Sequence, residues 1–75
     1  MISDRTAPDG ADFEFEAERP RLEGLAYRIT GSRATAEDLV QEAWLRWEGT
    51  DRSVVERPAA WLTTVTSRLA LDHLK

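Results

Sequence analysis

The chain is 75 residues long, contains no cysteine and carries a formal net charge of −4. This length, with 41% hydrophobic residues, allows one small domain with a single modest core. The lack of cysteine excludes disulfides, thiolate metal sites and a cysteine nucleophile, and it fits a reducing compartment. No apolar run approaches the roughly 20 residues that span a bilayer, and the acidic N-terminus is unlike a signal peptide, so we expect a cytoplasmic protein.

The N-terminal part predicts a lead-in followed by a helix. Residues 1–11 contain proline, glycine and few large apolar side chains, so we expect them to be disordered. A first helix is predicted over Asp12 to Thr30, where apolar residues recur at helical intervals until Gly31 provides a stop. Pro20 interrupts this pattern and is expected to bend the helix or to start a second one.

A second helix is predicted over Ala36 to Glu48. Thr35, followed three residues later by Asp38, resembles a capping box, and Gly49 is a natural C-cap. The residues expected to face the core share one side of this helix. They are Ala36, Leu39, Val40, Ala43, Trp44 and Trp47.

Residues 49–57 read as a loop, and Pro58 suits the first turn of a third helix that continues to the end of the chain. Its predicted buried stripe consists of Trp61, Leu62, Val65 and Leu69. Helices joined by short loops, with no alternating strand pattern, predict an all-α fold, a small three-helix bundle.

The exposed side of the second helix raises a question, because an apolar residue lies near the centre of a polar face. Asp38, Gln41 and Glu42 surround Leu45 on this face. A single surface leucine is ordinary and needs no explanation. The alternative is a binding face, since an apolar centre with a rim of carboxylates and an amide suits a basic helical partner.

The third helix carries hydroxyl and cationic side chains on a face beside its predicted stripe. Thr64, Arg68, Leu71 and Lys75 are spaced at about one turn each, with Thr63 and Ser67 alongside. Such groups can donate hydrogen bonds to phosphates and base edges. The alternative is ordinary solvent exposure, in which Arg68 pairs with Asp72 one turn later.

Other features speak against catalysis. The three tryptophans occupy predicted core positions, which favours packing over base stacking. His73, the only histidine, has no partner at metal-ligand spacing. No phosphate-binding loop, nucleophile and base pair, or organised carboxylate dyad is present, so we expect neither an enzyme nor a cofactor.

The charge distribution indicates two kinds of partner. A net charge of −4 and a pI near 4.9 argue against gripping duplex DNA by phosphate neutralisation alone. Residues 1–50 carry 11 acidic and 6 basic side chains, whereas residues 51–75 carry 3 and 4. An acidic first part and a faintly basic second part suggest two partners of opposite character.

The runs "LAYRITGSRATAEDLVQEAWLRW" and "RPAAWLTTVTSRLALDHLK" resemble region 2 of bacterial RNA polymerase sigma factors of the extracytoplasmic-function (ECF) group. These sequences are most similar to those of the subgroup that carries an additional C-terminal domain. The resemblance covers nearly everything after Phe13 and implies a region 2 domain over residues 12–75, a fragment without the later region 4.

The resemblance implies that the second helix docks on the clamp helices of the largest catalytic subunit of core RNA polymerase. The matching residues are Asp38, Gln41 and Glu42, with Leu45 as the apolar contact among them. The resemblance also implies that an anti-sigma factor, or an attached C-terminal domain, would restrain the protein.

The loop before Trp61 and the helix after it match the element that reads and melts the minus-ten promoter element and holds a flipped base of the non-template strand. The expected DNA-binding residues are Arg57, Thr64, Ser67, Arg68 and Lys75. This chain departs from the family at Arg68, where many members have asparagine, and at Pro58 and Ala59, near which many have an aromatic residue. The alternative reading is a helical interaction module that does not contact DNA.

Overall fold

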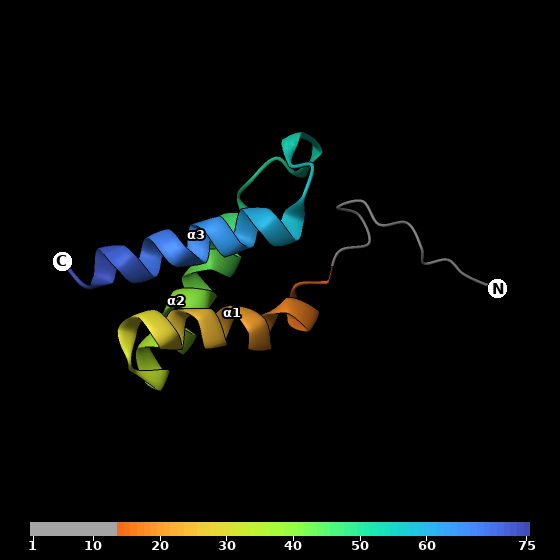
Figure 1. Ribbon diagram of the computed structural model, residues 1–75. Coiled ribbons are helices and arrows are strands. Elements are labelled where there is room, and N and C mark those ends of the chain that lie inside the picture. Colours follow the sequence, from red (N-terminus) through yellow and green to blue (C-terminus); the bar gives the residue numbers. More distant parts are fainter. Residues whose placement is uncertain (1–13) are drawn as a thin grey trace.

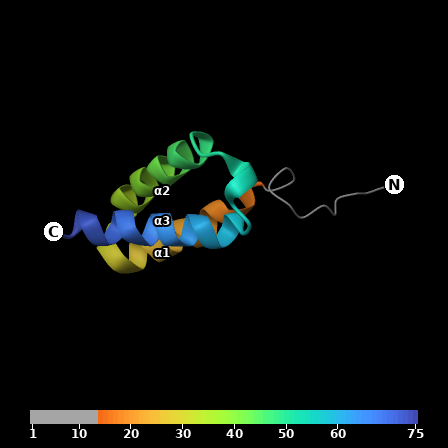
Figure 2. The same cartoon turned by 90° about the horizontal axis from the view of Figure 1, so that it is seen from above.

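The computed structural model describes residues 14–75, which form three α-helices and one short 3₁₀ helix. These elements are α1 (Phe15–Thr30), α2 (Arg33–Glu48), η3 (Arg52–Val54) and α3 (Pro58–His73). Each α-helix packs against the other two, and α2 runs in the opposite direction to α1 and α3 (Figure 1, Figure 2). The prediction of an all-α three-helix bundle is confirmed. The predicted lead-in over residues 1–11 and the predicted helix start at Asp12 lie outside the described residues.

Helix α1 ends at the predicted stop and continues through the proline. Gly31 adopts the left-handed conformation, with φ of 75°, and its N–H donates to the Tyr27 carbonyl at 2.7 Å. Glycine adopts this conformation without the steric cost that other residues incur. Pro20 lies inside α1, so the helix continues as one element and no second helix begins there.

The start of α2 differs from the prediction. The helix begins at Arg33, and the hydroxyl of Ser32 accepts a hydrogen bond from the Thr35 N–H at 3.1 Å. Ser32 is therefore the N-cap, and the prediction that Thr35 caps a helix starting at Ala36 is wrong. Serine and threonine are both favoured N-cap residues, because either hydroxyl can accept a hydrogen bond from a free N–H of the first turn. The sequence alone therefore did not distinguish Ser32 from Thr35. At the other end, Gly49 is the C-cap as predicted.

The core changes in character along the bundle. Large side chains fill the end near the α2–α3 connection, where the ring of Phe15 lies 4.8 Å from that of Trp44, and the ring of Trp47 lies 5.4 Å from that of Trp61. A second cluster, at the end where α1 passes into α2, contains only small buried residues. They are Ala26, Ala36 and Ala70, one from each helix. Small residues allow the three backbones to approach closely at this end.

The buried stripe of α3 is turned by about one residue from the predicted one. The fully buried positions are Pro58, Leu62, Thr66 and Ala70. Of the predicted residues only Leu62 is fully buried, whereas Trp61, Val65 and Leu69 are half-buried and pack against the core cluster. The prediction selected the large apolar side chains of α3, but the residues that face the other helices include the polar Thr66 and the small Ala70.

The predicted loop over residues 49–57 contains the short helix η3. The carboxylate of Asp51 accepts hydrogen bonds from the hydroxyl and the N–H of Ser53 at 2.6 and 3.0 Å, and these bonds hold the pKa of the Asp51 carboxyl below its usual value. Arg52 pairs with Glu48 at 3.0 Å and lies 4.9 Å from the Trp47 ring. The turn is thus fastened to the end of α2.

Candidate functional site

The polar face predicted on α2 exists and points directly away from the core. Asp38, Gln41, Glu42 and Leu45 are all exposed. At about 100° per residue they span an arc of about 100°, whose centre lies about 180° from the centre of the buried stripe. That stripe consists of Ala36, Val40, Ala43 and Trp47. We name the four exposed residues the α2 face.

Leu45 is 61% exposed at the centre of the α2 face. Among the residues that the structure describes, the side chains of Asp38 and Gln41 have no hydrogen-bond or ion-pair partner, while the Glu42 carboxylate accepts a bond from Arg46 Nη2 at 3.0 Å. The pair between Glu42 and Arg46 is exposed on both sides and stabilises the chain little. The face therefore offers an apolar contact surrounded by carboxylate and amide groups that intramolecular bonding hardly occupies.

A second outward face follows α3. Thr64, Arg68 and Leu71 are exposed within an arc of about 60°, on the side of α3 away from the buried stripe. Arg57 precedes the helix and Lys75 follows it, and both are exposed. We name this strip, with the half-buried Ser67 beside it, the α3 face. At about 1.5 Å per residue it spans about 27 Å.

The cations of the α3 face are differently engaged. Arg68 makes no ion pair within residues 14–75, and Asp72 pairs instead with Lys75 at 3.7 Å. The alternative in which Arg68 simply pairs with Asp72 is therefore wrong. Arg68 offers all its hydrogen-bond donors to solvent or to a ligand.

The tryptophans serve mainly to pack the bundle. Trp47 is 2% exposed, whereas Trp44 and Trp61 are half-buried at the edge of the core cluster. The preference for packing over stacking is confirmed for Trp47. Trp61, next to the α3 face, is only half-buried.

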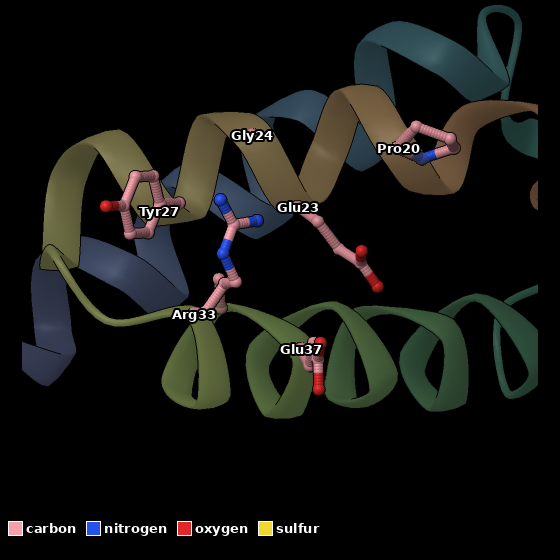
Figure 3. Close-up of a pocket in the computed structure, with 7 residues that line it drawn as sticks. Pro20, Glu23, Gly24, Tyr27, Arg33 and Glu37 are labelled. Atoms are coloured by element: carbon pink, nitrogen blue, oxygen red, sulfur yellow. The ribbon is translucent and has the colours of Figure 1, made fainter.

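An open groove of about 340 Å³ lies between helices α1 and α2. Its lining residues are Pro20, Glu23, Gly24, Tyr27, Arg33, Ala36 and Glu37. In Figure 3 Glu23 points from α1 toward α2, and Arg33 extends from α2 toward α1. Periodicity within one helix does not reveal this groove, because its walls come from two helices.

Metal and membrane sites are not evident in the described part of the chain. Within residues 14–75 no group of three or more carboxylate or histidine side chains is arranged to hold a metal ion. No helix in this range is long and apolar enough to cross a membrane. His73 is exposed at the end of α3.

Comparison with known families decides the identity of this fold. The sequence model described as Sigma-70 region 2 matches residues 15–75. The chain belongs to the Sigma-70 region 2 family. The predicted resemblance is confirmed at this level, and the match begins at the first residue of α1.

The curated relatives of this region 2 domain are ECF sigma factors. The chain is 61% identical over 62 residues to "ECF RNA polymerase sigma factor SigJ" of Mycobacterium tuberculosis, an alignment that covers 83% of this chain and 20% of that protein. It is 40% identical over 67 residues to "Probable ECF RNA polymerase sigma factor SigI" of the same species, covering 89% and 23%. The chain thus spans about a fifth of the length of these relatives. No solved structure gives a significant match.

Sequence reasoning on the region 2 domain missed Arg21. This side chain on α1 pairs with Glu18 at 2.7 Å and donates to the hydroxyl of Thr63 on α3 at 2.7 Å. The Thr63 hydroxyl in turn donates to the Ala59 carbonyl at 2.9 Å. Thr63 is therefore occupied in holding α3 against α1. The neighbouring Thr64, in contrast, has a hydroxyl that makes no hydrogen bond within the described residues.

Proposed function

We propose that this chain is a sigma factor domain that binds core RNA polymerase through the α2 face and opens promoter DNA at the minus-ten element through the α3 face. The observation that carries the proposal is the placement of Leu45. It is 61% exposed, lies opposite the buried stripe and is surrounded by the residues that match the polymerase-binding residues of the family.

The chemistry of the α2 face fits a basic helical partner. Leu45 provides an apolar anchor that gains about 1.5–3 kcal/mol if it is fully buried. Asp38 and Glu42 provide negative potential, which favours a basic surface and speeds its approach. We assign this partner to the clamp helices of the largest catalytic subunit. The acidic first part of the chain suits the same partner.

The α3 face supports the second half of the proposal. Extruding one base from the stack costs a few kcal/mol, and an acidic domain does not supply this energy through phosphate contacts alone. Polymerase would provide most of the nonspecific affinity, while the domain captures the extruded base. The proposed contacts of the non-template strand are Arg57, Thr64, Ser67, Arg68 and Lys75.

The polymerase half is tested by comparing two exposed leucines. Leu45→Ala is expected to weaken binding to core polymerase by about 1–3 kcal/mol, the loss of one apolar interface anchor. Leu71→Ala, on α3 and 54% exposed, is the matched control and should leave this affinity unchanged. Equal affinities for wild type and Leu45→Ala would return Leu45 to the status of an ordinary surface residue.

The DNA half is tested by charge reversal. Arg68→Glu should retain polymerase binding but lose promoter opening, measured with a fluorescent base analogue in the minus-ten element. Arg28→Glu, an exposed arginine on α1, is the matched control. Normal opening by Arg68→Glu would favour the alternative of an interaction module that does not contact DNA.

Several further assignments follow from the proposal. A transcription initiation factor acts by binding, so no catalysis and no cofactor are assigned to this domain, and it would act in the cytoplasm with the polymerase. An anti-sigma factor, or the additional C-terminal domain found in the subgroup that this chain resembles, would compete with polymerase for the α2 face or with DNA for the α3 face.

A further inference from the structure

The groove between α1 and α2 adjoins the α2 face. Glu37 lines the groove, and Gln41 of the α2 face follows it one turn later on nearly the same side of α2. A partner that covers the α2 face therefore reaches the opening of the groove. None of the residues that we assigned to polymerase or DNA lies within it.

Gly24 gives the groove its depth at a cost to the helix. Glycine inside a helix is about 1 kcal/mol less favourable than alanine. The left-handed conformation that justifies glycine occurs at Gly31 and not at Gly24. A Cβ atom added at Gly24 would meet no atom within 4 Å from the rest of the described chain, apart from its chain neighbours and the backbone of its own helix. Packing and backbone conformation within the described chain therefore do not require glycine here, and the missing side chain leaves room beside α1 for an external group.

The charges in the groove are separated along its length. At one end Arg33 lies 5.0 Å from the centre of the Tyr27 ring, which holds its cation close to that ring. Toward Pro20, Glu23 points from α1 toward α2, and Glu37 lines the groove from α2, with its carboxylate not turned toward α1 (Figure 3). Among residues 14–75 the Glu23 carboxylate has only a long ion pair with Arg19, at 3.7 Å, and the Glu37 carboxylate has no hydrogen-bond or ion-pair partner. This end of the groove suits a cation.

We propose that the groove receives a lysine or arginine side chain of the basic partner that docks on the α2 face. The aliphatic stem of this side chain would lie over Gly24, and its charged end would lie near Glu23 and Glu37. The inference rests on the proposed binding of polymerase and adds α1 to the binding surface.

Filling the groove tests the steric part of the proposal. Gly24→Leu places a side chain in the groove and also replaces glycine with a better helix former, so this variant should fold at least as stably as wild type. Its affinity for core polymerase should fall at least about tenfold, the loss expected of an important contact. Ala17→Leu is the matched control, since Ala17 is exposed on the same helix and does not line the groove. Its affinity should equal that of wild type.

Charge reversal tests whether the groove binds a cation, and it does so even if Gly24→Leu proves less stable than wild type. Glu37→Lys should weaken binding about tenfold, whereas Glu56→Lys, in the exposed connection before α3, should not. Wild-type affinity in Glu37→Lys, or in a stable Gly24→Leu, overturns the inference. Asp38→Arg is measured beside them: if it abolishes binding while the groove variants bind normally, only the groove assignment fails. If Asp38→Arg also binds normally, the proposed polymerase binding itself fails.

Discussion

Thr66 is a polar residue in the centre of the bundle, and its replacement by valine should stabilise the fold. Its side chain is fully buried on α3, and its hydroxyl has no hydrogen-bond partner among residues 14–75. Valine has nearly the same shape, with a methyl group in place of the hydroxyl. The two residues have similar helix propensities, so the change isolates the cost of the buried hydroxyl.

The expected gain follows from the burial. A buried hydroxyl without a partner costs about 1–3 kcal/mol relative to its hydrated state. Thr66→Val should therefore raise the free energy of unfolding by about 1–2 kcal/mol. For a domain of this size each kcal/mol shifts the melting temperature by about 4–8 °C. Thr66→Ser keeps the hydroxyl but removes a buried methyl group, and it should cost about 1 kcal/mol.

Urea denaturation followed by circular dichroism measures these differences. Thr64→Val is the matched control, because Thr64 is exposed two residues earlier on α3, and its effect should stay within about 0.5 kcal/mol. If Thr66→Val instead destabilises the fold relative to this control, the hydroxyl has a partner in solution, such as a carbonyl of the preceding turn. That result would show that the Thr66 hydroxyl is not unpaired in the folded protein.

Two further predictions concern the cap of α2 and the aromatic end of the core. Ser32→Ala should lower the free energy of unfolding by about 1 kcal/mol through loss of the N-cap, whereas Thr35→Ala should have a clearly smaller effect; the reverse order in urea denaturation would reinstate the sequence-based cap. Trp47→Ala should cost about 3–5 kcal/mol because this ring is almost fully buried. Trp61→Ala should cost measurably less by the same assay, and equal costs would show that Trp61 is as deeply buried as Trp47.

Much of the fold was predictable because its signals are local. The apolar periodicity of α2 correctly selected Val40, Ala43 and Trp47 as core residues, and Gly31 correctly marked the end of α1. The buried face of α3 was less predictable, because side-chain size and hydrophobicity favour Trp61 over Thr66. Which of two adjacent stripes lies inside depends on how closely the partner helices approach, and this is a property of the assembled bundle.

The candidate site was predictable where it lies on a single helix. The α2 face follows from spacing alone, and the structure places all four of its residues on the exposed side. The groove around Gly24 and the contact between Arg21 and Thr63 join residues from different helices, so no spacing within one element indicates them. From the sequence alone, Gly24 is only a residue of low helix propensity. That it lines a groove becomes evident only from the position of α2 beside it.

Binding of the α2 face to polymerase can be measured on the isolated partner segment. The affinity of the chain for the isolated clamp-helix segment should be measured at moderate salt for wild type and for Asp38→Arg. We expect micromolar binding by wild type and its loss in Asp38→Arg, while circular dichroism shows both chains equally helical. Equal binding by the two proteins, or none by a folded wild type, would show that the α2 face does not bind the clamp helices.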